Sequence, residues 1–288
     1  MTYQPKVLII GAGWLGTPLA ERLLLNGYHV TVTKRSNEAL SSLPEPLKKN
    51  AFVLDLAQFK GYQSNTIDAA QMISPLEQKY DYVIGSFPPG FRKGEPKTYI
   101  SNWENVVSIS QHCHAKKVIM TSTTGVYGSL TGSCTETDHP DTDSTNQTDE
   151  KVSILRAAER MVENSGISHS ILRLSGLIGP DRHPGRFVKH LKQVSQLAPA
   201  NMLHQEDAIN AIIFMLTHEN SGIVNVSTPE TTSKVAFYQA ALTDYTKEAE
   251  EFPKIVALED KKVVVSKLLS LGFTFTYQHT LETLKDCH

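Results

Sequence analysis

The sequence is poor in cysteine, and its few cysteines show no pairing pattern. There are three, Cys113, Cys134 and Cys287, far apart and without a C-x-x-C motif. An odd, widely spaced set argues against the disulfide framework of small secreted domains and gives no zinc-ligand pattern. We therefore expect a cytoplasmic protein without a metal site.

The chain also lacks an excess of charge of one sign and any long apolar run. Its 28 Lys and Arg residues and 30 Asp and Glu residues give a formal net charge of −2, so no basic surface for nucleic acid or anionic lipid is expected. The apolar run Val7 to Ile10 is too short for a signal peptide, and none approaches the ~20 residues that span a bilayer. These absences favour a soluble protein that acts on a small molecule.

The N-terminal segment carries the strongest motif of the chain. A predicted strand, Lys6 to Ile10, runs into Gly11-Ala-Gly13-Trp-Leu-Gly16 and then into an apolar helical pattern. Gly11 permits a tight turn, Gly13 lets backbone N–H groups approach a pyrophosphate, and Gly16 lets the helix pack close to its strand. The phosphates would lie at the positive end of the helix dipole. This context predicts dinucleotide binding and outweighs the alternative of a fortuitous glycine turn.

Strands and helices alternate after this motif. Strands are predicted over 29–33, 51–54, 82–85 and 117–121, with helices over 66–78, 98–113 and 149–164 among the connections. This order predicts an α/β fold, a Rossmann-type doubly wound parallel sheet. We expect a dinucleotide-binding domain over 1–175 and a smaller C-terminal substrate lobe over 176–288. Parts of the lobe's chain are expected to return to the sheet of the dinucleotide-binding domain. Expected elements of the lobe are helices over 187–194, 208–217, 233–247 and 263–271 and strands over 224–226 and 273–275.

The end of the second strand indicates which dinucleotide binds. It reads Thr33-Lys34-Arg35-Ser36, and no carboxylate lies between Glu21 and Glu38. NAD sites usually place an acid here, whereas NADP sites place a cation that meets the 2′-phosphate. Arg35 can form a bidentate contact and Lys34 adds a point charge, while Thr33 and Ser36 offer hydroxyl groups. We predict NADP as the cofactor, with NAD as the alternative. The competing interpretation is that Lys34 and Arg35 are only a solvated pair of charges on the surface.

The predicted cofactor-binding residues lie at the ends of four strands. They are Gly11, Ala12, Gly13, Trp14, Leu15 and Gly16 in the glycine turn, Thr33, Lys34, Arg35 and Ser36 after the second strand, Asp55 and Leu56 after the third, and Ser86, Phe87 and Pro88 after the fourth. Ligands of open α/β sheets bind at this edge.

A segment in the middle of the chain resembles a known family. Ser122-Thr-Thr-Gly-Val-Tyr-Gly128 is similar to the "VYG" segment of extended short-chain dehydrogenases/reductases, the NAD(P)-dependent epimerase/dehydratase group. The stretches at 173–180, 204–207 and 224–226 resemble later segments of that family, so the likeness covers nearly the whole chain. The residues at 13–16 and 179–186 are similar to an atypical subgroup of small bacterial proteins. The resemblance implies an oxidoreductase or epimerase.

The sequence departs from the family at the proton-transfer pair. The resemblance implies that Thr123 hydrogen-bonds the reacting oxygen and that a Tyr and a Lys on a following helix move the proton. A nearby cation is needed because a phenol of pKa about 10 is a poor base at neutral pH. No tyrosine occurs between Tyr127 and Tyr238. With Glu159 as the acidic anchor, the two positions hold Lys151 and Leu155 or, shifted by one residue, Val152 and Arg156.

Substrate contacts are predicted around the same turn and in the loop at 181–186. The residues are Ser122, Thr124, Arg182, His183 and Arg186. Arginines recognise phosphate or carboxylate, although local ion pairs are an equal alternative. The proton could be moved by Tyr127, Lys151, His183, His204 or water. Two interpretations of function stay open, an enzyme lacking the Tyr-x-x-x-Lys pair and a catalytically inactive NAD(P)-binding sensor or scaffold.

The resemblance also implies a homodimer formed through two helices. The helices predicted over 98–113 and 149–164 carry apolar residues at helical spacing. These are Trp103, Val106, Val107 and Ser110 on the first and Leu155, Ala158 and Val162 on the second. The same positions could equally pack on the sheet of their own chain.

Overall fold

The computed structural model describes residues 3–59, 74–91, 98–140, 147–219, 222–246 and 251–287. Most of the helix predicted over 66–78 lies outside these residues. By its internal contacts the chain divides into two compact units. Unit 1 comprises Met1–Ser122, Ser153–Leu172 and Ile212–Gly222, and unit 2 comprises Thr123–Val152, Arg173–Ala211 and Ile223–His288.

A seven-stranded parallel sheet forms the centre of the fold and confirms the Rossmann-type α/β class. Its strands are β1 (Lys6–Ile10), β2 (His29–Lys34), β3 (Ala51–Val53), β4 (Tyr82–Gly85), β5 (Lys117–Thr123), β7 (Ser168–Leu174) and β11 (Gly222–Val226). The spatial order is β11-β7-β5-β4-β1-β2-β3. The order reverses between β1 and β4, which is the switch point where open sheets of this kind bind ligands.

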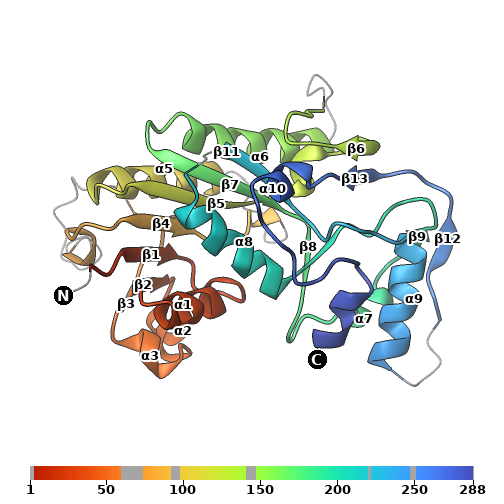
Figure 1. Ribbon diagram of the computed structural model, residues 1–288, viewed down its shortest axis with the longest axis horizontal. Coiled ribbons are helices and arrows are strands. Elements are labelled where there is room, and N and C mark those ends of the chain that lie inside the picture. Colours follow the sequence, from red (N-terminus) through yellow and green to blue (C-terminus); the bar gives the residue numbers. More distant parts are fainter. Residues whose placement is uncertain are drawn as a thin grey trace. The chain divides into compact units, whose positions relative to one another are not determined.

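Helices cover the strands of unit 1 with apolar faces at helical spacing. Figure 1 shows α1 (Gly16–Leu25) and α5 (Thr98–His112) on opposite sides of β1 and β4. Helix α1 buries Gly16, Leu19, Ala20 and Leu23. The other described helices with residues in this unit are α2 (Asn37–Ser41), α3 (Glu45–Lys48) and parts of α6 (Gln147–Glu163) and α8 (Gln205–Thr217). None of the helices in the described part of the chain is long and apolar enough to cross a membrane.

Except for Val107, which is partly exposed, the positions assigned to a dimer face are buried within the single chain. Trp103, Val106 and Ser110 of α5 are fully buried, as are Ala158 and Val162 of α6, and Leu155 is 2% exposed. Packing inside the monomer accounts for the spacing of the buried positions, and the homodimer stays a prediction.

Unit 2 contains short parallel strand pairs and a few helices. The pairs are β8 (Gly176–Ile178) with β10 (Met202–His204), β9 (Gln193–Ser195) with β12 (Lys254–Val256), and β6 (Gly132–Cys134) with β13 (Lys261–Val263). The helices are α7 (Gly185–Val188), α9 (Lys234–Tyr245) and α10 (Ser266–Ser270). A core cluster packs around Phe237, with Ile178, Met202 and Leu284 among its members.

Three sequence predictions for this unit are wrong in part. The helix predicted over 187–194 ends at Val188, because Gln193–Ser195 pairs with β12. The helix predicted over 263–271 is reduced to α10, because Val263 belongs to β13. Residues 273–275 are irregular. The first two errors have one cause, since strand partners far away in the sequence decide these conformations and local periodicity does not reveal them.

Candidate functional site

The glycine turn has the geometry that its three glycines predict. Gly11 has a φ of +100°, and a Cβ at this position would lie 2.4 Å from the carbonyl oxygen of Ser86. A Cβ on Gly16 would lie 2.4 Å from the carbonyl oxygen of Gly11. A Cβ on Gly13 would meet nothing within 4 Å. Gly11 and Gly16 therefore serve the turn itself, while Gly13 borders open space.

The open space beside Gly13 lies just before the start of α1. Helix α1 has no side-chain cap hydrogen bond at Leu15 and no acidic residue in its first turn. The positive end of the helix dipole is therefore not offset by a nearby carboxylate of the helix itself. The turn is tied to β2, because Ala12 N–H donates to Thr33 O at 3.0 Å and Gly11 N–H donates to Thr33 Oγ1 at 3.2 Å.

A cavity of about 250 Å³ extends from this turn along the carboxyl ends of the strands. It brings together four of the predicted groups: the glycine turn, the end of β2, the segment after β3 and Phe87 after β4. The lining residues are Ile10, Gly11, Thr33, Lys34, Arg35, Leu54, Asp55, Leu56, Ala57, Gln58, Phe87, Thr98 and Asn102. Gly11 is the part of the glycine turn that lines it. The other predicted cofactor residues outside the lining are Ala12, Gly13, Trp14, Leu15, Gly16, Ser36, Ser86 and Pro88.

The end of β2 gives the cavity a positive wall. Lys34 and Arg35 line it, and neither forms an ion pair with any residue in the described ranges. Burial lowers the pKa of Lys34, so an anion placed beside the ammonium group would stabilise its charged form. The hydroxyl of Ser36 is used by α2: it accepts from Ala39 N–H at 3.3 Å and donates to Glu38 Oε2 at 2.8 Å. Its expected contact with the ribose stays a prediction.

Helix α5 forms a wall of the cavity that sequence reasoning missed. Thr98 and Asn102 line the cavity, and Asn105 Nδ2 donates to the carbonyl oxygens of Leu56 (2.9 Å) and Phe59 (3.2 Å). The sequence did contain a signal for this wall. Thr98, Asn102 and Asn105 form a polar stripe at i, i+4 and i+7 on a helix whose opposite face is buried.

A close helix–strand contact fixes that wall. A Cβ on Gly85 would lie 2.3 Å from the Trp103 ring, and Phe87 stacks on the same ring with centroids 4.9 Å apart. The glycine at the end of β4 therefore allows Trp103 to seat α5 on the strand. This contact sets where Asn102, the residue before Trp103, meets the cavity.

The hydroxyls of Ser122 and Thr123, at the end of β5, both form hydrogen bonds within the chain. Ser122 Oγ donates to Glu159 Oε1 at 2.7 Å, and Arg156 Nη1 contacts Glu159 Oε2 at 3.0 Å. Thr123 Oγ1 accepts from Gly125 N–H at 3.1 Å and caps the 3-10 turn η3 (Thr124–Tyr127). A hydroxyl that accepts a hydrogen bond keeps its own proton for donation, so Thr123 can still donate to a substrate oxygen.

Tyr127 belongs to a buried network within unit 2. Its hydroxyl donates to Asn225 Oδ1 at 2.6 Å and accepts from Arg173 Nη1 at 3.0 Å. Arg173 also donates to Glu136 O at 3.1 Å, and its guanidinium lies 5.1 Å from the Tyr127 ring centroid. Burial raises the pKa of Tyr127, although Arg173 opposes the shift. Tyr127 is therefore a poor proton carrier at neutral pH.

The two candidate histidines also have partners on both ring nitrogens. His183 Nδ1 accepts from Gly185 N–H at 3.1 Å, and Nε2 lies 3.1 Å from Asp244 Oδ2. His204 Nδ1 accepts from Glu206 N–H at 3.1 Å, and Nε2 lies 3.1 Å from Asp286 O. Both rings orient backbone or neighbouring side chains inside unit 2. Their suggested contact with substrate or proton stays a prediction.

The predicted substrate loop is a tight turn with exposed cations. Asp181 has a φ of +61°, and Arg182 N–H donates to Gly179 O at 2.9 Å. Arg186 is exposed and donates through Nη1 to Asp181 O at 2.9 Å. Arg182 is partly exposed.

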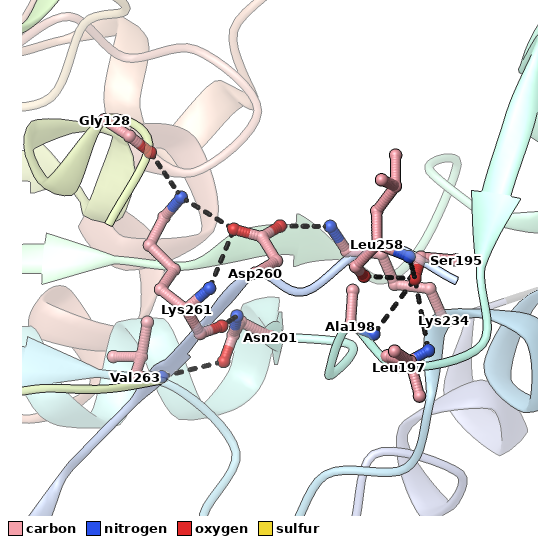
Figure 2. A network of polar contacts seen from close by, with 10 residues as sticks. All are labelled: Gly128, Ser195, Leu197, Ala198, Asn201, Lys234, Leu258, Asp260, Lys261 and Val263. Carbon is pink, nitrogen blue, oxygen red and sulfur yellow. Dashed lines mark hydrogen bonds and ion pairs between the residues drawn. The ribbon is translucent and has the colours of Figure 1, made fainter. Parts of the chain in front are cut away.

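A lysine near the C-terminus holds the end of the η3 turn, as Figure 2 shows. Lys261 Nζ donates to Gly128 O at 2.8 Å and lies 3.2 Å from Asp260 Oδ1. Asp260 also pairs with Lys234, the first residue of α9. Burial alone would raise the pKa of Asp260, but Lys234 and Lys261 hold it below its usual value. No local pattern could reveal this contact, because its partners lie far apart in the sequence.

Comparison with known proteins identifies the family. The model of the NAD dependent epimerase/dehydratase family matches residues 7–227. The chain belongs to this family. Protein YeeZ of Escherichia coli (strain K12) is 28% identical over 282 residues, which cover 96% of this chain and 97% of YeeZ.

Solved structures of other proteins have the same fold. The Bordetella bronchiseptica enzyme WbmH in complex with NAD+ is 19% identical with a TM-score of 0.74, covering 99% of this chain and 97% of WbmH. The UDP-glucuronic acid 4-epimerase from Bacillus cereus in complex with NAD is 18% identical with a TM-score of 0.71, covering 98% of this chain and 96% of the epimerase. The predicted family and fold are confirmed.

Proposed function

We propose that this epimerase/dehydratase family member is an NADP-dependent oxidoreductase or epimerase that works without a Tyr-x-x-x-Lys pair. The observation that carries the cofactor choice is the positive wall of the cavity, where Lys34 and Arg35 follow β2 and no carboxylate takes the position usual in NAD sites. Gly13 and the start of α1 would hold the pyrophosphate. The bound cofactor would supply hydride transfer.

The substrate is a small molecule with a phosphate or carboxylate group, recognised by Arg182 and Arg186. Both side chains reach the surface of unit 2, and guanidinium groups bind such anions bidentately. The solved relatives include a UDP-glucuronic acid 4-epimerase, whose named substrate carries both groups. Nucleotide sugars are therefore the first compounds to test in a nicotinamide-absorbance assay.

The cofactor proposal is tested by removing one cation. Arg35→Ala should weaken NADP(H) binding by about 1.5–3 kcal/mol, as expected for loss of a hydrogen bond to a charged group, and should leave NAD(H) binding nearly unchanged. Calorimetric titration of both cofactors measures the two affinities. Lys49→Ala, at an exposed lysine outside the cavity lining, is the matched control for net charge. Tighter binding of NAD than of NADP by the unchanged protein would refute the proposal.

Proton transfer is proposed to use Thr123 together with a water molecule. Tyr127, His183 and His204 are less suited, because their polar atoms already hold other groups in unit 2. Thr123 would polarise the reacting oxygen by donating its hydroxyl proton.

Thr123→Ala should therefore lower kcat by about 10² while the cofactor affinity stays within about twofold. Thr123→Ser keeps both the hydroxyl and the turn cap, so it should restore most of the rate. Steady-state kinetics on a substrate found in the panel, combined with cofactor titration, separates the two effects. An equal loss of cofactor affinity in Thr123→Ala would show that Thr123 faces the cofactor instead.

A further inference from the structure

The η3 turn connects Thr123 with Gly128 through two hydrogen bonds. Thr123 Oγ1 accepts from Gly125 N–H at 3.1 Å, and Gly125 O accepts from Gly128 N–H at 3.1 Å. A 3-10 turn of this length has weak hydrogen-bond geometry and little stability of its own. A contact that holds Gly128 from outside the turn therefore also limits the positions open to Thr123.

Lys261 supplies such a contact from the C-terminal part of the chain. Its Nζ donates to Gly128 O at 2.8 Å, as Figure 2 shows. Glycine has more conformational freedom than any other residue, so the conformation of Gly128 depends on contacts from its neighbours. A hydrogen bond with a charged donor is roughly twice as strong as one between neutral groups. The ammonium group is therefore well suited to fix the end of the turn.

Asp260 keeps the Lys261 ammonium group charged and in place. Its Oδ1 lies 3.2 Å from Lys261 Nζ and also accepts from the Lys261 backbone N–H at 2.8 Å. Its Oδ2 pairs with Lys234 at the start of α9. The Lys261 side chain is only 17% exposed, so solvent and salt screen this pair less than a pair on the open surface. A fixed carboxylate thus directs the ammonium group at the turn.

The backbone of Lys261 is held independently of its side chain. Asn201 Nδ2 donates to Lys261 O at 2.8 Å, and Asn201 Oδ1 accepts from Val263 N–H at 2.9 Å. The strand β13 also pairs with β6. These residues belong to unit 2 together with Thr123 and Gly128. A change of the Lys261 side chain therefore removes the contact with the turn while the strand that carries it keeps its partners.

We propose that Lys261 is a positioning residue, which acts on the reaction through Thr123 by holding Gly128. The inference rests on the proposed function, in which Thr123 donates to the reacting oxygen. Without the ammonium group the turn is less restricted, so the Thr123 hydroxyl is aimed at that oxygen in a smaller fraction of the molecules. Lys261 does not line the cavity, so the affinity for the cofactor should not change.

The first test needs no substrate and uses NMR of protein with 13C-labelled threonine methyl groups. Thr123→Ala identifies the Thr123 signal by its loss. Lys261→Met should shift that signal, whereas Lys261→Arg, which keeps a charged donor, should leave it near its original position. Lys262→Met is the matched control, because Lys262 is an exposed lysine of the same strand, and it should not move the signal. An unmoved Thr123 signal in folded Lys261→Met would overturn the inference.

The second test is kinetic and uses a substrate from the nucleotide-sugar panel. Lys261→Met should lower kcat about tenfold, while KM and the cofactor affinity stay within about twofold. In the Thr123→Ala background the same change should lower kcat by less than about twofold, because the hydroxyl that Lys261 positions is gone. A lysine with a merely structural role would lower kcat by the same factor in both backgrounds.

The outcomes separate this inference from the proposed function. If Thr123→Ala leaves kcat unchanged, the proposed role of Thr123 is refuted, and this inference with it. If Thr123→Ala lowers kcat but Lys261→Met does not, or if the two losses multiply in full, only the role of Lys261 is refuted. Circular dichroism melting checks that the variants fold. If Lys261→Met does not fold, Lys261→Gln replaces it in both tests with the same expected results.

Discussion

Gly13→Val should abolish dinucleotide binding in a protein that stays folded, whereas Gly16→Val should destabilise the fold itself. A Cβ on Gly13 meets no protein atom within 4 Å, so the valine side chain would occupy only the space in which the pyrophosphate approaches the backbone. A Cβ on Gly16 would lie 2.4 Å from the Gly11 carbonyl oxygen. That contact can be relieved only by moving α1 away from β1, at a cost of about 3 kcal/mol or more.

Thermal melting with and without cofactor distinguishes these two effects. For Gly13→Val we expect an unchanged melting temperature without cofactor and no increase on adding NADP at millimolar concentration, since a ligand that does not bind gives no stabilisation. For Gly16→Val we expect a lower melting temperature without any cofactor. A folded Gly13→Val protein that is stabilised by NADP like the original would refute the assignment of the glycine turn.

The cofactor half of the site could be predicted from the sequence because its signals are local. Gly11, Gly13 and Gly16 act within one strand–turn–helix unit, and Lys34 and Arg35 follow the next strand directly. Asn102 could not be found in the same way. Its place in the cavity depends on Trp103 resting on Gly85, a contact between segments whose pairing only the folded chain reveals.

The C-terminal half was less predictable because its short strands pair over long sequence distances. Val194 lies opposite Ile255, and Cys134 lies opposite Val263. Strands of three residues show too little alternation to be distinguished from a helix or loop. Lys261 is a further example, since its bond to Gly128 depends on the β6–β13 pairing.

Three family-like segments of the sequence meet in one buried network. Tyr127 comes from the "VYG" segment, Arg173 from the strand that follows the helix, and Asn225 from the late "VNV" strand. Their side chains are hydrogen-bonded in series, and all three residues are fully buried. The likeness of these segments to the family thus has a structural reason within unit 2, separate from the chemistry of Thr123.

Arg173→Met should lower the free energy of unfolding by about 3–5 kcal/mol, the largest stability loss that we predict for a single side chain outside the glycine turn. The change keeps apolar volume but removes the fully buried guanidinium that donates to the Tyr127 hydroxyl and to the partly buried Glu136 carbonyl. Tyr127→Phe should cost about 1–3 kcal/mol, because Asn225 Oδ1 loses its donor. The double variant should lose less than the sum, since both changes break the same hydrogen bond. Urea unfolding of the four proteins measures the coupling, and strictly additive losses would show that the network does not act as a unit.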